Sequence, residues 1–231
     1  MRALQEKELR TQEVANRENL TATEAVRQLQ RLADSGLIRR LSDGSYINTE
    51  YGKIILHLSR SIEFVFRYRE YFSTHDLLVL PQKLINRIGE LSEAQLSMDT
   101  MKNLDLGQRI LSEAREFSWG IGEGHIPDLM VPVMNSQMRK GVTLRFITPE
   151  GLVPPSSPER NVEIRGLSTV PVILVLSEKE AVVCFRFREG RVDYAGFSGK
   201  DEDFRSWVRD LFLDLWEKSS RYQPRNSNSA V

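Results

Sequence analysis

Between Thr11 and Gly52, the spacing of apolar and polar residues predicts two helices followed by two short strands. Polar residues dominate 11–19, and over 22–35 the apolar residues recur every three or four positions, which gathers them on one side of a helix. Thr21 and Glu24 have the spacing of a capping box, and Gly36 follows the last turn as a stop signal. The helix over 22–35 is therefore expected to pack through its apolar residues, which are Ala22, Ala25, Val26, Leu29, Leu32 and Ala33.

The pair Asp43-Gly44 separates two segments in which apolar and polar residues alternate. Such a pair is a strong hairpin signal, because both central positions of a two-residue turn need a positive φ. Helix, capped helix and hairpin, in that order, are typical of a winged helix-turn-helix. We therefore predict this fold for residues 1–50.

Residues 51–72 show helical spacing without a proline, which predicts one helix about 33 Å long. Its apolar positions are Ile54, Ile55, Leu58, Ile62, Val65, Phe66 and Phe72. A helix of this length exceeds what a small winged-helix domain needs. We expect a homodimer through 51–72, with Ile55, Leu58, Ile62 and Phe66 at the seam. The alternative is that this stripe packs against the chain's own second domain.

From residue 92 onwards strands and helices alternate, as in an α/β layered domain. Strands are expected over 94–98, 117–121, 142–147, 162–165, 170–176, 181–188 and 191–198, and helices over 101–114, 126–140 and 204–219. The last two strands form a hairpin at Glu189-Gly190. The predicted class is α+β or α/β: a winged helix (1–50), linker and dimerisation helices (51–91), an α/β sensor domain (92–219) and a polar, disordered tail (220–231).

Composition indicates a cytoplasmic protein and says little about its partner. The 32 basic and 32 acidic residues cancel, and residues 1–72 hold 12 Lys and Arg against 10 Asp and Glu. Any DNA affinity must therefore come from local placement of charge, or from its doubling in a dimer. The single cysteine, Cys184, excludes an intramolecular disulfide and is expected in the core. The N-terminus lacks the apolar stretch of a secretory signal, and no apolar run approaches the roughly 20 residues that span a bilayer.

The polar side of the helix over 22–35 carries side chains that suit DNA recognition. Arg27, Gln28 and Arg31, with Thr23, are expected to reach base edges in the major groove, because arginine suits guanine and glutamine suits adenine. Arg39, Arg40 and Ser45 are expected at the phosphates beside the wing, and Thr21, at the start of the helix, completes the set. The alternative is an ordinary amphipathic surface helix whose charges are only solvated.

A search for catalytic motifs finds none. The order of strands and helices also resembles the phospholipase D fold, whose chemistry needs a histidine with a lysine two residues on. None of His57, His75 and His125 is followed in this way. The motifs H-x-x-x-H, C-x-x-C and G-x-S-x-G and a Walker A loop are absent too. We therefore expect no enzyme, no metal and no cofactor.

A glycine-rich run, WGIGEGHIPD, follows the predicted strand over 117–121. Ligands of open α/β sheets bind near the carboxyl ends of strands. Trp119, Gly122, His125 and Arg145 are therefore candidates for an effector pocket. A plain tight turn is the alternative, since the run does not match G-x-G-x-x-G and Glu123 would repel a phosphate.

The chain resembles archaeal winged-helix transcriptional regulators with a sensor domain of the methanogenesis-regulator type. The resemblance covers about residues 5–218 and rests on VRQLQRLADSGLI, GSYINTEYGKIIL, HDLLVLPQKLINRIGEL, EFSWGI and RKGVTLRFITPE. It implies DNA binding, usually as a dimer, and a C-terminal domain that senses a signal. The chain departs from the pattern at its start, where only MRALQEK takes the place of a full first helix.

Two functions are compatible with these observations. The first is a transcription regulator that binds double-stranded promoter DNA and is modulated by an unidentified small-molecule effector. The alternative is a protein-interaction module whose winged helix no longer binds DNA, which the small net charge of residues 1–72 and the short first helix favour.

Overall fold

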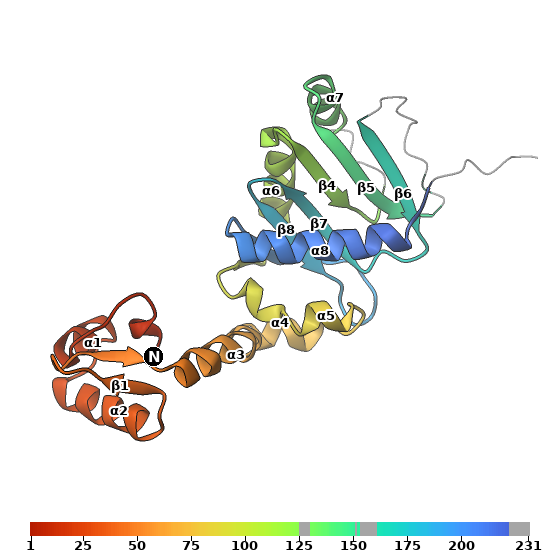
Figure 1. Ribbon diagram of the computed structural model, residues 1–231. Helices are drawn as coiled ribbons and strands as arrows, with labels where there is room; N and C mark the ends of the chain where they lie inside the picture. Colours follow the sequence, from red (N-terminus) through yellow and green to blue (C-terminus); the bar gives the residue numbers. More distant parts are fainter. Residues whose placement is uncertain (125–129, 151, 153–160, 222–231) are drawn as a thin grey trace, which may run out of the picture. The chain divides into compact units, whose positions relative to one another are not determined.

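The computed structural model describes residues 1–124, 130–150, 152 and 161–221, and these form two compact units (Figure 1). The first unit comprises Met1–Glu63 and the second Phe64–Val231. The class is mixed α+β, with a large mixed sheet in the second unit. The expected tail falls almost entirely on 222–231, outside the described residues.

In the first unit the two predicted helices are followed by a two-stranded antiparallel hairpin, in the predicted order. Register pairs Ile38 with Asn48 and Arg40 with Tyr46. The isolated bridge between Leu9 and Tyr46 adds a further backbone contact to this hairpin. The elements are the 3-10 helix η1 (Arg2–Leu4), α1 (Thr11–Arg17), α2 (Ala22–Asp34), β1 (Ile38–Arg40), β2 (Tyr46–Asn48) and the start of α3 (Glu50–Arg67).

The predicted limits of α2 are confirmed by its caps. The Thr21 hydroxyl accepts the Glu24 N–H at 3.3 Å, and the Glu24 carboxylate accepts the Thr21 N–H at 3.0 Å. Both halves of the capping box are therefore present. At the other end Gly36 has a φ of 70°, which ends the helix at little steric cost. The small core beneath α2 consists of Ala3, Leu4, Leu9, Val14, Leu29, Ile38 and Tyr46.

The turn between β1 and β2 differs from the expected two-residue turn. Of its described residues only Gly44 has a positive φ, of 86°. Leu41 O accepts the Gly44 N–H at 3.1 Å, and the Leu41 N–H donates to Ser45 O at 2.8 Å. These bonds define a three-residue loop in which Gly44 takes the left-handed position. Asp43 needs no positive φ in a loop of this type, and its carboxylate accepts the Ser45 N–H at 3.0 Å.

The prediction of a single helix over 51–72 is wrong, because the helix is interrupted at Tyr68. α3 ends at Arg67, and α4 (Arg69–Thr74) starts after Tyr68, whose φ of −109° and ψ of 29° leave the helical region. The Tyr68 hydroxyl donates to Ala94 O at 3.2 Å, and its ring packs edge-on against Phe197. These tertiary contacts decide where the helix stops.

The second unit is built on an eight-stranded sheet with the order β10-β6-β5-β4-β7-β8-β9-β3. β4, β5 and β6 are parallel, and the remaining pairs are antiparallel. The strands are β3 (Gln95–Ser97), β4 (Phe117–Ile121), β5 (Thr143–Pro149), β6 (Val162–Leu167), β7 (Val172–Ser177), β8 (Ala181–Phe185), β9 (Gly196–Gly199) and β10 (Ser220–Arg221).

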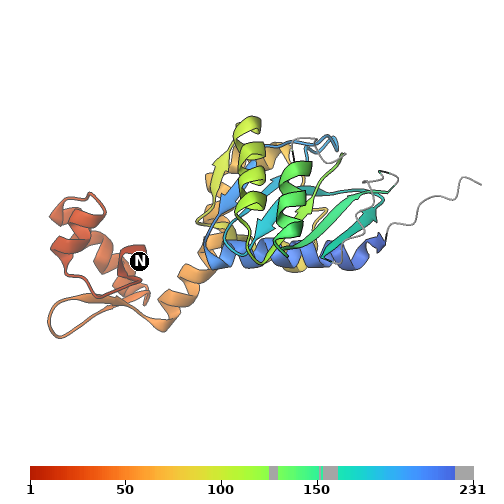
Figure 2. The same cartoon turned by 90° about the horizontal axis from the view of Figure 1, so that it is seen from above.

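Helices cover both faces of this sheet (Figures 1 and 2). α6 (Thr100–Glu113) and α7 (Val131–Arg139) lie on one face, and α8 (Glu202–Lys218) lies on the other. The short helices α5 (Gln82–Ile85) and η2 (Ile88–Leu91) join the α8 side, where Leu84, Leu91 and Trp207 belong to one buried cluster. The segment LPQKLINRIGEL therefore supplies part of the main core.

Most predicted strands and helices of this unit are found, but both strands of the last predicted hairpin are shorter than expected. The strand expected over 181–188 ends at Phe185, as β8. The strand expected over 191–198 is reduced to β9, because 186–195 form an irregular excursion held by the Arg186 side chain, which donates to Val170 O and Gly190 O. Gly190, with a φ of 83°, still makes the expected turn. β10 was not expected. The predicted start of α7, at Ile126, lies outside the described residues.

Candidate nucleic-acid interface

The two sides of α2 are separated as its sequence predicts, except that Ala22 and Val26, both expected on the packing side, are exposed. Ala25 and Leu29 are buried, whereas Arg27 and Arg31 are exposed. Val26, expected on the packing side, is 55% exposed and lies beside Arg27. The outward face of α2 therefore combines cations and amides with one apolar side chain, and its exposed polar members are Thr23, Glu24, Arg27, Gln28, Gln30 and Arg31.

Thr21 acts as a cap within the protein. Its hydroxyl lies 2.7 Å from the Glu24 carboxylate and is therefore already engaged. The side-chain and backbone hydrogen bonds from Thr21 lower the pKa of Glu24, with a smaller contribution from Arg27. Glu24 consequently stays ionised on the outward face and places a negative charge near Arg27.

The two hairpin arginines lie on opposite faces of the ribbon, since successive residues of a strand alternate. Arg40 shares a face with Tyr46, and its guanidinium lies 6.0 Å from the centre of that ring. Arg39 stands opposite Ile47 and points to the other face. Both side chains are exposed. Arg40 is on the same side of the ribbon as the buried Ile38, and Arg39 is on the other side. The two arginines therefore do not form one cluster.

Ser45 does not belong to the exposed set. It is 4% exposed, and its hydroxyl lies 2.7 Å from Asp43 Oδ1. Hydrogen bonds from the Ser45 hydroxyl and N–H lower the pKa of the Asp43 carboxyl. Ser45 therefore shapes the turn, while Asp43 keeps a second negative charge near the wing.

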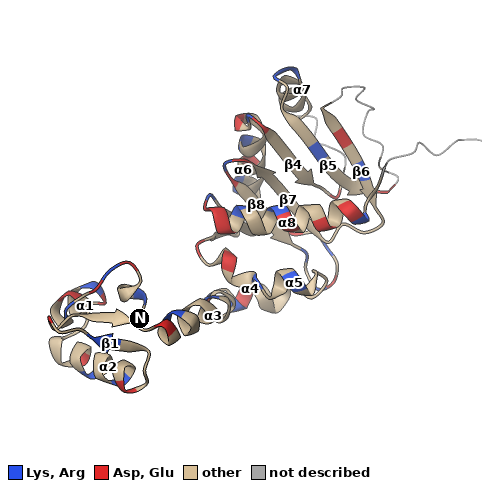
Figure 3. Cartoon of the chain, viewed as in Figure 1, with Lys and Arg blue, Asp and Glu red and all other residues tan. Residues whose placement is uncertain are grey.

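Four arginines of this unit donate no side-chain hydrogen bond and form no ion pair among the described residues. Within the described part of the chain, no ion pair holds the guanidinium of Arg27, Arg31, Arg39 or Arg40. Lys and Arg positions of α2 and β1 are coloured in Figure 3. Arg17, in contrast, donates to Ala3 O at 3.3 Å. The free guanidinium groups keep all their donors for a partner.

The effector-pocket candidates of the second unit are only partly brought together. The Trp119 ring stacks on Phe212 of α8 at 5.0 Å, and the Arg145 guanidinium lies 5.2 Å from Trp119 and 5.4 Å from Trp216. Gly122 anchors the end of β4 through its N–H to Ile147 O. His125 lies outside the described residues. Trp119 and Arg145 thus pack against α8, a contact that the sequence pattern did not predict.

Two other reactive side chains are used in packing. His75 is buried, with Nδ1 2.7 Å from Tyr71 O and Nε2 3.0 Å from Asp193. Cys184 is buried, and burial raises the pKa of its thiol to about 12. Among the described residues, no group of three or more His, Cys, Asp or Glu side chains could hold a metal ion. None of the helices described is long and apolar enough to cross a membrane.

No protein-family model and no curated protein matches the chain. Solved structures do resemble it. TrmBL2, described as an archaeal chromatin protein with a novel mode of DNA binding, is 14% identical over 93% of this chain and 88% of its own, with a TM-score of 0.48. NucT from Helicobacter pylori is 10% identical over 56% of this chain and 100% of its own (TM-score 0.45). Nuc from Salmonella typhimurium, a phospholipase D family member, is 8% identical over 52% and 90% (TM-score 0.40).

These comparisons correct one expectation. The sequence motifs led us to expect that the chain is not an enzyme. The similar structures include NucT and a member of the phospholipase D family, which takes its name from an enzyme. The expectation is therefore withdrawn.

Proposed function

We propose that the chain binds double-stranded DNA through its first unit, acting as a winged helix-turn-helix with α2 as the recognition helix. The observation that carries this proposal is the outward face of α2, where Arg27 and Arg31 are exposed and engaged in no ion pair of the described chain. Surface cations of this kind attract phosphates and release counterions on binding. The buried side chains Ala25 and Leu29 hold that face in place.

The residues divide into two roles. Arg27, Gln28 and Arg31, with Thr23, would contact base edges in the major groove, because they lie on one exposed helix face. Arg39 and Arg40 would contact phosphates on the two faces of the wing. Thr21 and Ser45 have internal partners and would support the site from within.

The two roles are separable by experiment. We expect Arg27→Ala to cost about 1 to 3 kcal/mol on the preferred sequence and to relax the preference between sequences. Arg40→Ala should weaken binding to all sequences about equally. Fluorescence anisotropy on the region upstream of the chain's own gene, and on shuffled duplexes, measures both. Absence of salt-sensitive binding by the wild type would rule the proposal out.

Specific binding at physiological salt generally needs more contacts than one winged helix supplies, which favours two copies. The exposed stripe of α3 supports a dimer, since Leu58, Ile62 and Phe66 are 61%, 73% and 69% exposed. Ile54 is 59% exposed and belongs to this stripe. Ile55, which the sequence placed at the seam, is half-buried, so Ile54 takes its place. We propose that the second copy of the chain covers this stripe.

Ile62→Glu tests the dimer, because burying such a side chain is worth about 1.5 to 3 kcal/mol and a carboxylate there is costly. We expect sedimentation at micromolar concentration to give a dimeric wild type and a monomeric variant. Lys53→Glu, on a side of α3 away from the stripe, is the control and should remain dimeric. A monomeric wild type, or a dimeric Ile62→Glu, would exclude this seam.

A second function is favoured by one observation. Glu24 and Asp43 remain ionised near the arginines, and Val26 is exposed among them. A mixed surface of this kind suits a protein partner as well as a nucleic acid. Transcription regulation and the sensing of an effector near Trp119 and Arg145 are extensions of the DNA-binding proposal.

A further inference from the structure

A polar pocket opens at the amino-terminal ends of β4 and β5, the opposite ends from those where the sequence suggested a ligand. It is an open hollow of about 550 Å³, lined by Ser112 to Arg115, Lys140, Val142 and Lys179. Pockets of roughly 300 to 1,000 Å³ hold small organic ligands. Three cations and one carboxylate, that of Glu113, line it, so the pocket favours an anion.

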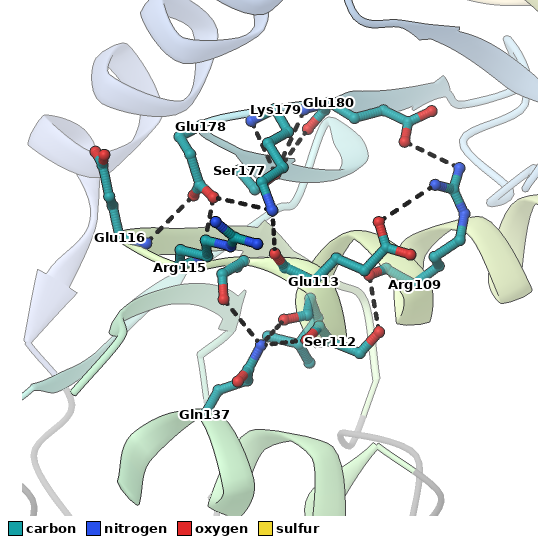
Figure 4. A network of polar contacts seen from close by, with 12 residues as sticks. Arg109, Ser112, Glu113, Arg115, Glu116, Gln137, Ser177, Glu178, Lys179 and Glu180 are labelled. Carbon is teal, nitrogen blue, oxygen red and sulfur yellow. Dashed lines mark hydrogen bonds and ion pairs between the residues drawn. The ribbon is translucent and has the colours of Figure 1, made fainter. Parts of the chain in front are cut away.

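The backbone around the pocket is fixed by side chains from three directions (Figure 4). Gln137 Nε2 lies 2.6 Å from Ser112 O and 3.1 Å from Ala114 O. The Lys179 ammonium donates to Glu113 O at 2.8 Å. The last carbonyl groups of α6 therefore have internal donors and do not present their lone pairs to a ligand.

Glu178 fixes the segment between α6 and β4. Its carboxylate accepts the Arg115 N–H at 2.9 Å and the Glu116 N–H at 3.4 Å. Burial raises the pKa of Glu178, but these backbone hydrogen bonds outweigh burial and leave the pKa below its usual value. The carboxylate is thus ionised and accepts hydrogen bonds from the backbone. It does not pair with the Arg115 guanidinium group.

Lys140 is held at the pocket by the end of α7. The Val142 N–H donates to Gln137 O and the Gly141 N–H to Met138 O, with Gly141 at a φ of 81°. This pattern is the Schellman motif, and Lys140 is its C-cap. A rigid cap therefore fixes the backbone from which the Lys140 side chain extends.

The cations around the pocket differ in their engagement. Arg109 pairs with Glu180 at 2.9 Å, and Lys179 bonds to Glu113 O. The side chains of Arg115 and Lys140 have no hydrogen bond or ion pair within the described residues. Two unengaged cations on a fixed backbone border one pocket.

We propose that Arg115 and Lys140 bind the phosphate group of a small organic phosphate in this pocket. Guanidinium and ammonium groups form strong, charge-assisted hydrogen bonds with phosphate oxygens. The volume exceeds what one phosphate fills, so the rest of the pocket receives the organic part. This inference rests on the second unit alone and is independent of DNA binding.

NMR titration of the full chain with ribose 5-phosphate tests the proposal. Ribose is the control without a phosphate group, and inorganic phosphate is the control without an organic part. We expect saturable shifts of the Arg115, Lys140 and Gly141 amides with ribose 5-phosphate, smaller shifts with inorganic phosphate, and none with ribose. Arg115→Gln and Lys140→Gln should each weaken binding about tenfold, because each substitution removes one hydrogen bond to a charged group. Neither side chain has an internal partner, so both variants should fold.

The double variant Arg27→Gln/Arg31→Gln separates this pocket from the nucleic-acid interface and should bind ribose 5-phosphate as the wild type does. Three results would overturn the proposal. They are the absence of saturable shifts up to roughly 10 mM ligand, equal shifts with ribose, and unchanged affinity in Arg115→Gln/Lys140→Gln.

Discussion

The arginines of α2 and β1 in the first unit differ in their pairing from several cations of the second unit. In the second unit Lys83 lies 2.8 Å from Asp214, and Arg186 lies 2.8 Å from Glu123. In the first unit the exposed arginines of α2 and β1, among them Arg31, have no such partner in the described residues. Exposed ion pairs contribute only about 0 to 1 kcal/mol to stability, so the first unit loses little by leaving its arginines unpaired.

This difference has a functional meaning. An arginine already paired with a carboxylate must break that pair before it can bind a phosphate, whereas an unpaired one needs no rearrangement. The same contrast occurs within the second unit, where Arg115 and Lys140 are unengaged beside the paired Arg109. The unpaired arginines of α2 and β1, and Arg115 with Lys140 at the pocket, are therefore the two places where we expect anionic partners.

The cores differ as well, and the largest expected effect lies in the second unit. Trp207 is fully buried, and its Nε1–H donates to Leu84 O at 2.9 Å. Trp207→Ala should lower the free energy of unfolding of this unit by about 3 to 5 kcal/mol, because it leaves a cavity and removes the hydrogen bond to Leu84 O.

Hydrogen exchange measures this effect in each unit separately. In Trp207→Ala the amides of β7 and β8 should lose protection while those of α2 keep theirs. Trp207→Phe, which retains most of the ring volume, should have a smaller effect. Equal loss of protection in α2 would contradict the independence of the two cores.

Gly52→Ala is the matching change in the first unit. A Cβ at this position would lie 1.9 Å from Leu37 O, a backbone atom that cannot move aside without shifting the chain. We expect a loss of about 3 kcal/mol, at the upper end for overpacking, with exposure of α1 and α2 to limited proteolysis. Gly122→Ala is the control, since no atom lies within 4 Å of the added methyl group. A wild-type digestion pattern for Gly52→Ala would refute this packing.

A smaller, pH-dependent effect is expected at Glu178. Its pKa is lowered from 4.5 in the folded chain, because hydrogen bonds from the backbone outweigh burial. Its contribution to stability is therefore present above pH 4.5 and is lost as the pH falls through the lowered value. Urea unfolding from roughly pH 3 to 6 should show a decrease that Glu178→Gln reduces. Identical pH profiles of the two proteins would exclude this role.

Sequence reasoning worked best where structure is decided locally. The capping box of Thr21 and Glu24 and the stop at Gly36 depend on neighbouring residues, and both are found. It failed where tertiary contacts decide. The break at Tyr68 follows from its bond to Ala94 O, 26 residues away. The irregular segment before β9 follows from the bonds of the Arg186 side chain to Val170 O and Gly190 O.

The same distinction applies to the candidate sites. Helical periodicity identified the exposed arginines of α2, because exposure on a helix follows from spacing. It misassigned Ala22 and Val26, which are exposed although their spacing places them with the buried Ala25 and Leu29. The pocket beside Arg115 was missed, because its lining comes from segments that are distant in sequence. Nothing in the local sequence around Lys140 or Lys179 indicates that both residues line the same pocket.

The salt dependence of DNA binding tests the central claim most directly, because its slope counts the phosphates neutralised, at about 0.9 for each. The exposed Arg39 and Arg40 of the first unit, which we assign to phosphates, should each reduce the slope by about 1 when changed to glutamine. Lys102→Gln, at an exposed position of the second unit, should leave the slope unchanged. Binding without a salt dependence, or the same reduction from Lys102→Gln as from Arg39→Gln and Arg40→Gln, would contradict the assignment of DNA binding to the first unit.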